Sequence, residues 1–385
     1  MDEETRLIRA GAPPAELSKT VGPPIQKGST VLLPSAAALY DDDAYITYGR
    51  GGLASQEALK DALAEMEGAA GVSLYPSGLA AITGAMLAVL KAGDQVLAGD
   101  NIYKPSRRFC DQVLKRFGVE VRYFDPSQTP EAVVGMAGPA TRLILLESPG
   151  SLTFEMQDLS AVAQLAQARG VLTMADNTWG AGYLFKPLAH GIDISVQALT
   201  KYVGGHSDVF MGSAAARDPK LAQALANGIH HLGWAVSPED AYMMLRGLRT
   251  LPARLEQQGQ ASLRIAAWLR EQPEVAQVLH PALPGSPGHE LWARDYSGTC
   301  GLFGFVLRPR SETAVNAFLD RLKLFGLGFS WGGFESLAIV CDPQLPRRAF
   351  APKFEGPLIR LHIGLETPSD LIEDLRAGLD AYAAG

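Results

Sequence analysis

Apolar residues in the first part of the chain recur with the spacing of α-helices. In residues 56–67 they fall every three or four positions, and the segment ends at Gly68, which is typical of a surface helix with one buried face. Residues 79–90 are apolar around more of their circumference, which indicates a more deeply buried helix. The pattern therefore predicts two helices before residue 91.

Short apolar runs then alternate with helical segments. The runs have the length and composition of buried strands, and they comprise residues 96–98, 119–124, 143–146, 171–175 and 191–198. Amphipathic segments at 106–117 and 159–169 lie between some of them. Alternating strands and helices favour a largely parallel sheet covered by helices. We therefore predict an α/β fold.

The last third of the chain has a different pattern. A helical stretch from Pro238 to about Arg270 leads out of the alternating region. The segment from Val278 to Ala384 then has strands and helices of its own, predicted at 302–307, 337–341 and 358–363 for strands and at 312–325 and 369–383 for helices. This region is expected to form a smaller α+β domain.

Composition and charge favour a globular protein that acts on a small molecule. Apolar residues make up 47% of the 385 residues, which is enough for two domains with substantial cores. The formal net charge of -7 is not concentrated in long like-charge runs. This argues against nucleic acid or an anionic membrane as the main partner.

Cysteine usage and the N-terminal segment indicate a cytoplasmic protein. Cys110, Cys300 and Cys341 are an odd number without CxxC spacing, so neither a disulfide framework nor a metal cluster is expected. Residues 1–30 lack the apolar core of a signal peptide, and no later run reaches membrane-spanning length.

Two polar residues follow predicted strands at the same edge of the sheet. Asp176 comes directly after residues 171–175, and Lys201 follows the strand at 191–198, just before a glycine-rich turn. Ligands of such sheets bind beyond the carboxyl ends of the strands, so we expect the two side chains to converge. A lysine amine can hold an aldehyde as a Schiff base, and a carboxylate can keep a pyridine nitrogen protonated. The pair predicts pyridoxal 5'-phosphate (PLP) chemistry, with a solvated surface lysine as the alternative.

Two further segments have the residue types of a phosphate site. Ser77 and Gly78 begin a predicted helix, whose free N–H groups suit a phosphate, although Ser77 also makes an ordinary helix cap. Tyr48 and Arg50 lie in a glycine-rich segment that suits an anion but is equally typical of a surface loop.

An aromatic residue and a cation remain open to two interpretations. Tyr103 precedes a predicted helix, where its ring either covers a planar cofactor or packs against the sheet. Arg360 lies in an alternating strand, where burial is costly without an anion. It therefore binds either a substrate carboxylate or a structural acidic partner.

Several segments resemble the Cys/Met-metabolism family of PLP enzymes, and within it the bacterial cystathionine β-lyases. The matching segments follow the family's order along nearly the whole chain, and they are 48–51, 176–182, 197–202, 205–208, 246–251, 280–285 and 360–366. The resemblance implies an α/β architecture of fold-type I PLP enzymes, with a mostly parallel seven-stranded sheet covered by helices and a smaller C-terminal α+β domain. The expected divisions are an N-terminal arm at 1–52, a large PLP-binding domain at 53–247 and a C-terminal domain at 248–385.

The same resemblance implies roles for residues of the cofactor site. Lys201 would bind PLP covalently, Asp176 would contact the pyridine nitrogen, and Tyr103 would stack on the ring. The implied phosphate ligands are the backbone of Gly78 and Leu79, the hydroxyl of Thr200, and Tyr48 and Arg50 from a neighbouring subunit. The active unit would then be at least a dimer, and family members are commonly tetramers built from two such dimers. Ala198 departs from many members, which have a serine near the phosphate.

The substrate side of the site determines the implied reaction. Arg360, with Ser330 and Trp331, would bind the substrate carboxylate, and a tryptophan after the serine resembles the β-lyases rather than the γ-specific enzymes. The implied reaction is β-elimination of L-cystathionine to homocysteine, pyruvate and ammonia in methionine biosynthesis. Lys201 would move the protons, and either Tyr48 or Tyr103 would deprotonate the incoming amine.

Several other activities remain open at this point. Cysteine and cystine are expected as possible side substrates. Cystathionine γ-synthase, cystathionine γ-lyase and methionine γ-lyase are the nearest alternative enzymes, because they share the first steps of the reaction. A PLP-binding regulatory protein without turnover is the alternative outside enzymes.

Overall fold

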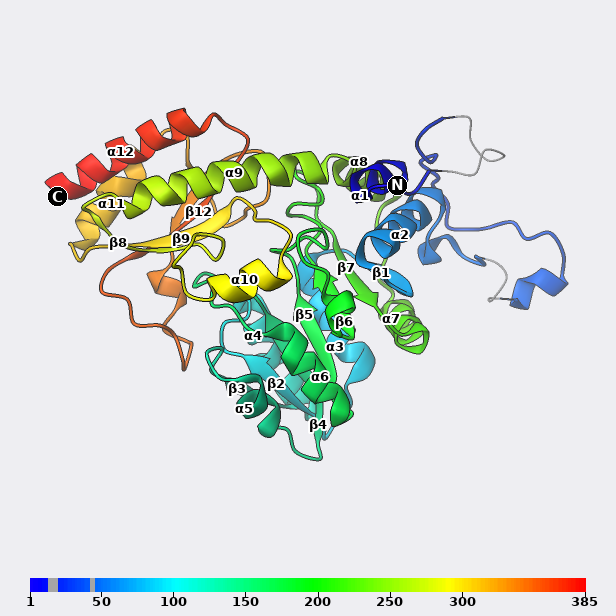
Figure 1. Ribbon diagram of the computed structural model, residues 1–385. Helices are drawn as coiled ribbons and strands as arrows, with labels where there is room; N and C mark the ends of the chain where they lie inside the picture. The colour runs from blue at the N-terminus through cyan, green and yellow to red at the C-terminus, as the bar shows by residue number, and fades with distance from the viewer. Residues whose placement is uncertain (13–19, 42–45) are drawn as a thin grey trace.

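Two β-sheets, each packed against helices, organise the chain (Figure 1). The computed structural model describes residues 1–12, 20–41 and 46–385. The two intervening segments belong to the expected N-terminal arm and lie outside the described residues. Among the described residues, no helix is long and apolar enough to cross a membrane.

The larger sheet has seven strands in the order β1-β7-β6-β5-β4-β2-β3. Its central strands are parallel, and only β7 runs antiparallel to its neighbours β1 and β6. The expected mostly parallel, seven-stranded sheet is thus confirmed. The strands are β1 (Gly71–Tyr75), β2 (Gln95–Gly99), β3 (Glu120–Phe124), β4 (Thr141–Glu147), β5 (Leu172–Asp176), β6 (Ile194–Gln197) and β7 (Gly212–Ala216).

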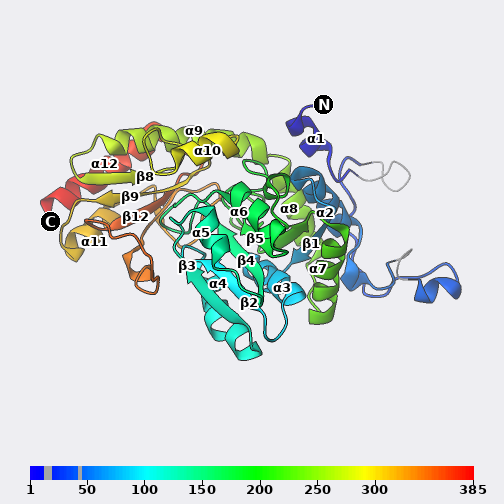
Figure 2. The same cartoon turned by 60° about the horizontal axis from the view of Figure 1, so that its bottom comes forward.

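Helices cover both faces of this sheet, as Figure 2 shows. In β4, Leu143 and Leu145 pack on one face, whereas Ile144 and Leu146 pack on the other. Because both faces are buried, the strand is apolar at successive positions rather than at alternate ones. The helices around this sheet are α2 (Ala54–Glu67), α3 (Gly78–Val89), α4 (Lys104–Gln112), α5 (Pro130–Gly135), α6 (Leu159–Ala168), α7 (Pro219–Leu232) and α8 (Pro238–Leu248), with the short helices η3 (Leu114–Phe117) and η4 (Pro187–His190).

The smaller sheet has five strands in the order β10-β11-β12-β9-β8. Phe303 and Phe305 of this sheet pack with Phe318 in a separate core. The elements are the strands β8 (Val275–Leu279), β9 (Leu302–Leu307), β10 (Gly326–Leu327), β11 (Leu337–Val340) and β12 (Leu358–His362), and the helices α9 (Leu251–Arg270), α10 (His289–Asp295), α11 (Glu312–Arg321), η5 (Asp342–Gln344) and α12 (Pro368–Ala384). The expected α+β character of the C-terminal region is confirmed.

The structure corrects two predicted helices. The helical stretch expected from Pro238 to about Arg270 consists of two helices, because α8 ends at Leu248 and α9 begins at Leu251. Pro252 has no N–H group to bond the carbonyl oxygen of Leu248, four residues earlier, so the helix ends there and a new one begins with the proline in its first turn. The helix expected at 106–117 is likewise divided into α4 and the short helix η3.

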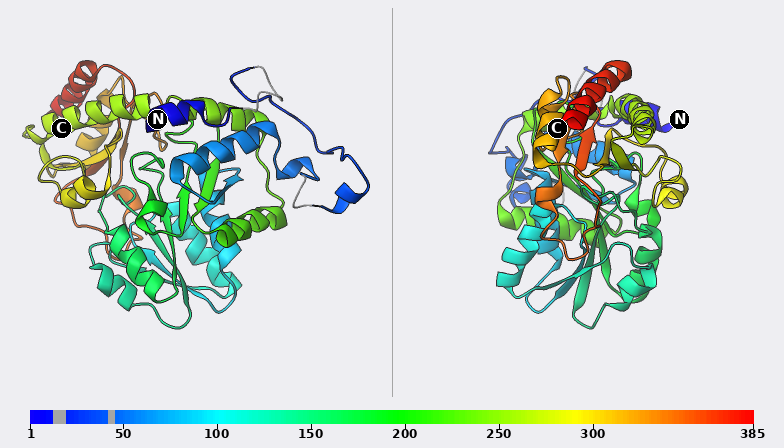
Figure 3. Two further views of the ribbon diagram at one scale, coloured as in Figure 1. Left: turned by 45° about the vertical axis from the view of Figure 1, so that its right-hand side comes forward. Right: turned by 90° about the vertical axis from the view of Figure 1, so that its left-hand side faces the viewer.

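The N-terminal segment includes α1 (Glu3–Arg9), η1 (Ala37–Tyr40) and η2 (Gly49–Gly51). The hydroxyl of Tyr183 donates a 2.9 Å hydrogen bond to Glu4 and holds α1 near the large sheet. The described part of the following arm, up to residue 41, extends away from the rest of the chain in Figure 1 and in the left view of Figure 3. It carries exposed apolar side chains, with Val21 89% exposed and Leu32 and Tyr40 each 92% exposed.

The two sheets are joined by the long helix α9 and by side-chain contacts. The indole N–H of Trp179, which follows β5, donates a 3.1 Å hydrogen bond to the carbonyl oxygen of Leu302 in β9. Trp179 is buried, and its ring contacts Tyr296 edge to face. A buried polar contact of this kind fixes the orientation of one sheet relative to the other.

We expect Trp179→Phe to lower the free energy of unfolding by about 1–3 kcal/mol, because a buried carbonyl loses its donor. Urea denaturation at one fixed protein concentration measures this change. The control is Phe117→Leu at a side chain that is 62% exposed, for which a change within about 0.5 kcal/mol is expected. Equal stability of the two variants would contradict the contribution of the indole hydrogen bond.

Candidate active site

Lys201 lies in a tight turn beyond the carboxyl end of β6. Its backbone N–H donates to the carbonyl oxygen of Ala198 at 3.0 Å, which closes the turn. Its side-chain Nζ donates to the hydroxyl of Ser330 at 2.9 Å. Ser330 lies in the segment between β10 and β11. The amine of Lys201, which follows a strand of the large sheet, therefore contacts a segment of the small-sheet region.

The segment after Ser330 packs directly on this turn. Gly332 has a φ of +84°, and a Cβ there would lie 2.9 Å from the Cα and 2.8 Å from the carbonyl carbon of Lys201. Both the backbone conformation and the space require glycine. The glycine allows the preceding residue, Trp331, to place its ring centre 5.3 Å from Lys201 Nζ.

Asp176 ends β5 next to the lysine turn. Its Oδ1 accepts hydrogen bonds from the hydroxyl of Thr178 at 2.6 Å and from the Thr178 N–H at 3.1 Å. The same hydroxyl accepts a 2.9 Å bond from the N–H of Ala198. Thr178, which the sequence analysis missed, therefore links the carboxylate to the turn of Lys201. Loss of hydration in this recess raises the pKa of Asp176.

The environment of Lys201 favours its neutral amine. Burial lowers its pKa to about 8, and the positive charge of Arg360 acts in the same direction, whereas Asp176 opposes the shift. An amine with this pKa is partly unprotonated near neutral pH, so it can act as a nucleophile or a base.

Arg360 lies in β12 and is 7% exposed. Its Nη2 donates to the carbonyl oxygens of Phe329 and Ser330, both at 3.0 Å. No acidic side chain pairs with its guanidinium among the described residues. The alternative of a structural salt bridge is therefore not supported, and the partly satisfied guanidinium is suited to an anion.

Tyr103 lies in the loop between β2 and α4, and 44% of it is exposed. Its backbone N–H donates a 2.6 Å hydrogen bond to Oε2 of Glu147. Glu147 ends β4 in register with Asp176. Burial and the nearby Asp176 raise the pKa of Glu147 well above its usual value. Burial, with these two carboxyl groups, also raises the pKa of Tyr103.

Glu147 was not predicted as a site residue, although its position directly after the predicted strand 143–146 was an available signal. His362, which is buried and contacts Gly332, was not predicted either. Burial lowers the pKa of His362 to about 3, so the ring is neutral. Its Nε2 accepts the N–H of Gly332 at 3.1 Å and supports the segment that contains Trp331.

The start of α3 lies against the same turn. The hydroxyl of Ser77 accepts a 3.1 Å hydrogen bond from the N–H of Ala80. Ser77 is therefore a helix cap, which was the alternative interpretation of this residue. The N–H groups of Gly78 and Leu79 make no hydrogen bond within the described residues. A Cβ on Gly78 would lie 2.4 Å from the Cβ of Ala198. Glycine therefore allows the helix terminus to approach the turn of Lys201 closely.

Thr200 holds the other side of this turn. Its hydroxyl donates to the carbonyl oxygen of Met211 at 3.1 Å and accepts the Met211 N–H at 2.9 Å. These two bonds fix the backbone directly before Lys201. The side chain of Thr200 thus lies in the expected region of the site, beside the turn that carries the lysine.

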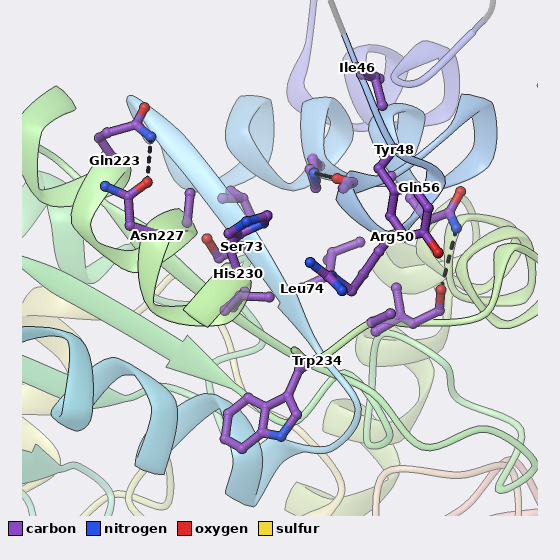
Figure 4. A pocket seen from close by; sticks show the side chains of 18 of the residues that line it. Ile46, Tyr48, Arg50, Gln56, Ser73, Leu74, Gln223, Asn227, His230 and Trp234 are labelled. Carbon is purple, nitrogen blue, oxygen red and sulfur yellow. Dashed lines mark hydrogen bonds between the residues drawn. The ribbon is translucent and has the colours of Figure 1, made fainter. Parts of the chain in front are cut away.

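Tyr48 and Arg50 lie elsewhere in the chain. They line a separate cavity of about 630 Å³ between the arm, β1 and α7. Figure 4 shows both side chains in this pocket with His230 and Trp234. None of the residues around Lys201 described above lines it. The structure therefore does not bring Tyr48 and Arg50 together with Lys201 within one chain.

We expect the Lys201 amine of the cofactor-free protein to react with acetic anhydride with a midpoint near pH 8, because the protonated amine cannot attack. Mass spectrometry at this lysine measures the rate as a function of pH. In Arg360→Met the midpoint should rise, because a positive charge that lowers the Lys201 pKa is removed.

The control for this experiment is Arg116→Met at an exposed arginine, which should leave the Lys201 midpoint unchanged. A midpoint in the wild-type protein close to 10.5, the ordinary value for a lysine, would contradict the burial of this amine.

The chain is similar to known proteins over nearly its whole length. A family model described as Cys/Met metabolism PLP-dependent enzyme matches residues 4–380. The chain is 42% identical to the cystathionine beta-lyase MetC of Escherichia coli, over 97% of each protein. It is also 42% identical to a cystathionine beta-lyase of Bordetella avium, over 99% of this chain and 98% of that protein.

Solved structures show the same fold. The crystal structure of cystathionine gamma synthase from Xanthomonas oryzae pv. oryzae in complex with cystathionine superposes with a TM-score of 0.92 at 35% identity, over 100% of this chain and 99% of that one. Together with the family match, these similarities over nearly the whole length assign the chain to the Cys/Met metabolism family of PLP-dependent enzymes.

Proposed function

We propose that the protein is a carbon–sulfur lyase that uses PLP to eliminate the β-substituent of L-cystathionine, forming homocysteine, pyruvate and ammonia. The family match and the cystathionine beta-lyases that are 42% identical over nearly full length support this reaction. The expected role is in methionine biosynthesis, with cysteine or cystine as side substrates.

The residues around Lys201 fit PLP. The N–H groups of Gly78 and Leu79 at the start of α3 are available to a phosphate, at the positive end of a helix dipole. Thr200, next to Lys201, would add its hydroxyl by turning the O–H from the carbonyl oxygen of Met211 to the phosphate. Asp176 accepts hydrogen bonds only through Oδ1 within the described residues, which leaves Oδ2 to hold the proton of a pyridine nitrogen.

When bound, PLP supplies a ring that accepts the electrons left on the substrate Cα after its proton is removed. Lys201, whose amine would hold the cofactor at rest, would take that proton and return it to the departing sulfur. Its pKa of about 8 suits both directions of transfer near neutral pH. Tyr103, half-exposed above this recess, would cover the ring.

The small-sheet region would bind the carboxylate of the substrate. Arg360 is held by two carbonyl oxygens rather than by an acid, so a substrate carboxylate would be its anionic partner. Ser330 contacts both cations, because its carbonyl oxygen accepts from Arg360 and its hydroxyl accepts from Lys201 Nζ at 2.9 Å. These contacts would place the substrate Cα beside the lysine.

The position of Trp331 is the observation that favours β-elimination over γ-elimination. Its ring centre lies 5.3 Å from Lys201 Nζ and 5.4 Å from the ring of Tyr202. γ-Elimination needs a second proton taken from Cβ, so the lysine must reach further along the substrate. An indole beside the amine narrows the space for that movement and favours transfer at Cα alone.

The arm supports an active unit of at least two subunits. Tyr48 and Arg50 do not join Lys201 within one chain, and the arm presents exposed apolar residues such as Leu32 and Tyr40. A second copy would cover this surface and receive Tyr48 and Arg50 at its own phosphate site. We propose a homotetramer built as a pair of such dimers.

Two further assignments complete the proposal. The break between α8 and α9 supports a domain boundary near 247–248, with the arm at 1–52 and the two domains at 53–247 and 248–385. Cys110, Cys300 and Cys341 are buried and free, which suits a reducing compartment and supports a cytoplasmic location.

Product analysis tests the proposed reaction. Purified protein with PLP and L-cystathionine is expected to release pyruvate and homocysteine in equal amounts, measured by chromatography. Lys201→Ala, which lacks the amine that moves the protons, is the inactive control. Formation of 2-oxobutyrate and cysteine would instead identify a γ-lyase, and bound PLP without any product from a panel of sulfur amino acids would identify a binding protein.

Subunit mixing tests the role of the arm. Lys201→Ala and Arg50→Ala are each expected to be inactive, but co-refolded mixtures should regain about a quarter of the wild-type activity, because half of the dimers are mixed and each has one complete site. A mixture of Lys201→Ala with Asp176→Asn is the control, since both changes affect residues of one chain's site. No recovery with Arg50→Ala would contradict a contribution from the neighbouring subunit.

A further inference from the structure

Asp100 is a fully buried carboxylate near the site, at the end of β2. Its two oxygens accept four hydrogen bonds. Oδ1 accepts from Nη2 of Arg107 and from the N–H of Ala349 at 3.1 Å, and Oδ2 accepts from Nε of Arg348 at 3.2 Å and from the N–H of Phe350 at 3.0 Å. Three of these donors come from the small-sheet region, so this carboxylate joins the two parts of the chain.

Arg348 is the centre of the contact from the other side. It lies in the connection between β11 and β12, and its side chain is 7% exposed. In Figure 1 the orange segment before β12 descends towards α4. Besides Asp100, the guanidinium binds Oε1 of Glu155 at 2.8 Å and the hydroxyl of Thr153. Two carboxylates and two guanidinium groups thus form one network of ion pairs, which we call the clasp. Its members are Asp100, Glu155, Arg107 and Arg348.

The clasp holds the loop that carries Tyr103. Asp100 lies three residues before Tyr103, and the intervening Asn101 donates from Nδ2 to the carbonyl oxygen of Glu147 at 3.2 Å. The N–H of Tyr103 binds the carboxylate of the same Glu147 at 2.6 Å. Arg348 thus holds the loop at Asp100, and Glu147 holds it at Asn101 and Tyr103. Backbone bonds from Asp100 to Phe124 and from Ser151 to Asn101, both at 2.9 Å, add to these contacts.

The clasp also constrains the chain on the substrate side. The connection that contains Arg348 runs into β12, whose Arg360 holds the carbonyl oxygens of Phe329 and Ser330. Buried charges are tolerated only when they are paired, and removal of one partner leaves an uncompensated charge. Removal of one charged partner is therefore expected to disrupt the contact between the loop that carries Tyr103 and the connection before β12.

We propose that Arg348 and Asp100 are positioning residues, which set the distance between Tyr103 and the Arg360 side of the site. The reaction part of this inference rests on the proposed function, whereas the ordering of the Tyr103 loop does not. A loop that loses its contact with Arg348 leaves the carboxylate of Asp100 partly unpaired and samples other conformations more often, so the ring of Tyr103 leaves its place above the recess more often. Misplacement of about 1 Å costs about 100-fold in rate.

The test compares Arg348→Met with Arg347→Met, because Arg347 is the adjacent, exposed arginine. Amide hydrogen exchange of the cofactor-free protein is followed by mass spectrometry in peptides covering 100–107 and 345–350. In Arg348→Met we expect exchange at 100–107 to be at least about tenfold faster than in the control. We also expect kcat/KM for cystathionine to fall about 100-fold, with secondary structure unchanged.

Arg348→Lys keeps the charge but loses the planar, forked geometry, so an intermediate effect of about tenfold on kcat/KM is expected. If Arg348→Met does not fold, the same two measurements on Arg348→Lys test the proposal. Exchange at 100–107 equal to that of Arg347→Met would overturn the proposal, and so would faster exchange without a change in kcat/KM. If cystathionine is not turned over at all, the proposed function fails, while the exchange measurement still decides the anchoring of the loop.

Discussion

The placement of an amine next to a guanidinium in a poorly hydrated recess is the constraint on which the rest of the structure depends. Lys201 and Arg360 are both positively charged in water, and burial lowers the pKa values of both, while the charge of Arg360 lowers the pKa of Lys201 further. Neither is neutralised by a short ion pair within the described residues. The protein compensates with Asp176 near the amine and with two carbonyl oxygens on the guanidinium. Such an arrangement is costly for stability and is typical of a functional site.

Two sheets are needed to build this recess, because each supplies a different part of the chemistry. The carboxyl ends of β4, β5 and β6 present acids and the lysine turn at one edge, as parallel sheets generally do. The small sheet supplies the guanidinium through β12 and the indole through the segment after β10. Trp179, Gly332 and the clasp are the contacts that hold these parts in register. The site is consequently as sensitive to the contact between the sheets as to the residues that line it.

The sequence alone predicted the part of the site that follows from strand ends. Lys201 and Asp176 converge because both follow parallel strands, which a pattern of apolar runs can locate. Glu147 follows a strand in the same way, but nothing in the pattern relates its carboxylate to the N–H of Tyr103. The strand β7 was missed because its sequence, Gly-Ser-Ala-Ala-Ala, lacks the β-branched and aromatic residues that mark strands. Tyr48 and Arg50 line a cavity apart from Lys201 within one chain, and a pattern of apolar runs does not relate the arm to the edge of the sheet.

The close approach of Gly78 to Ala198 has a consequence for how this chain can change during evolution. A Cβ on the glycine would lie 2.4 Å from the alanine Cβ, and also 2.8 Å from its Cα. Enlargement of residue 78 would therefore have to be accompanied by movement of the backbone before Lys201, whatever residue occupies position 198. The two positions form a coupled pair in which 198 can vary among small side chains while 78 stays fixed. In an alignment of related proteins, position 78 would thus be invariant for reasons of space, even if its N–H had no role in binding a phosphate.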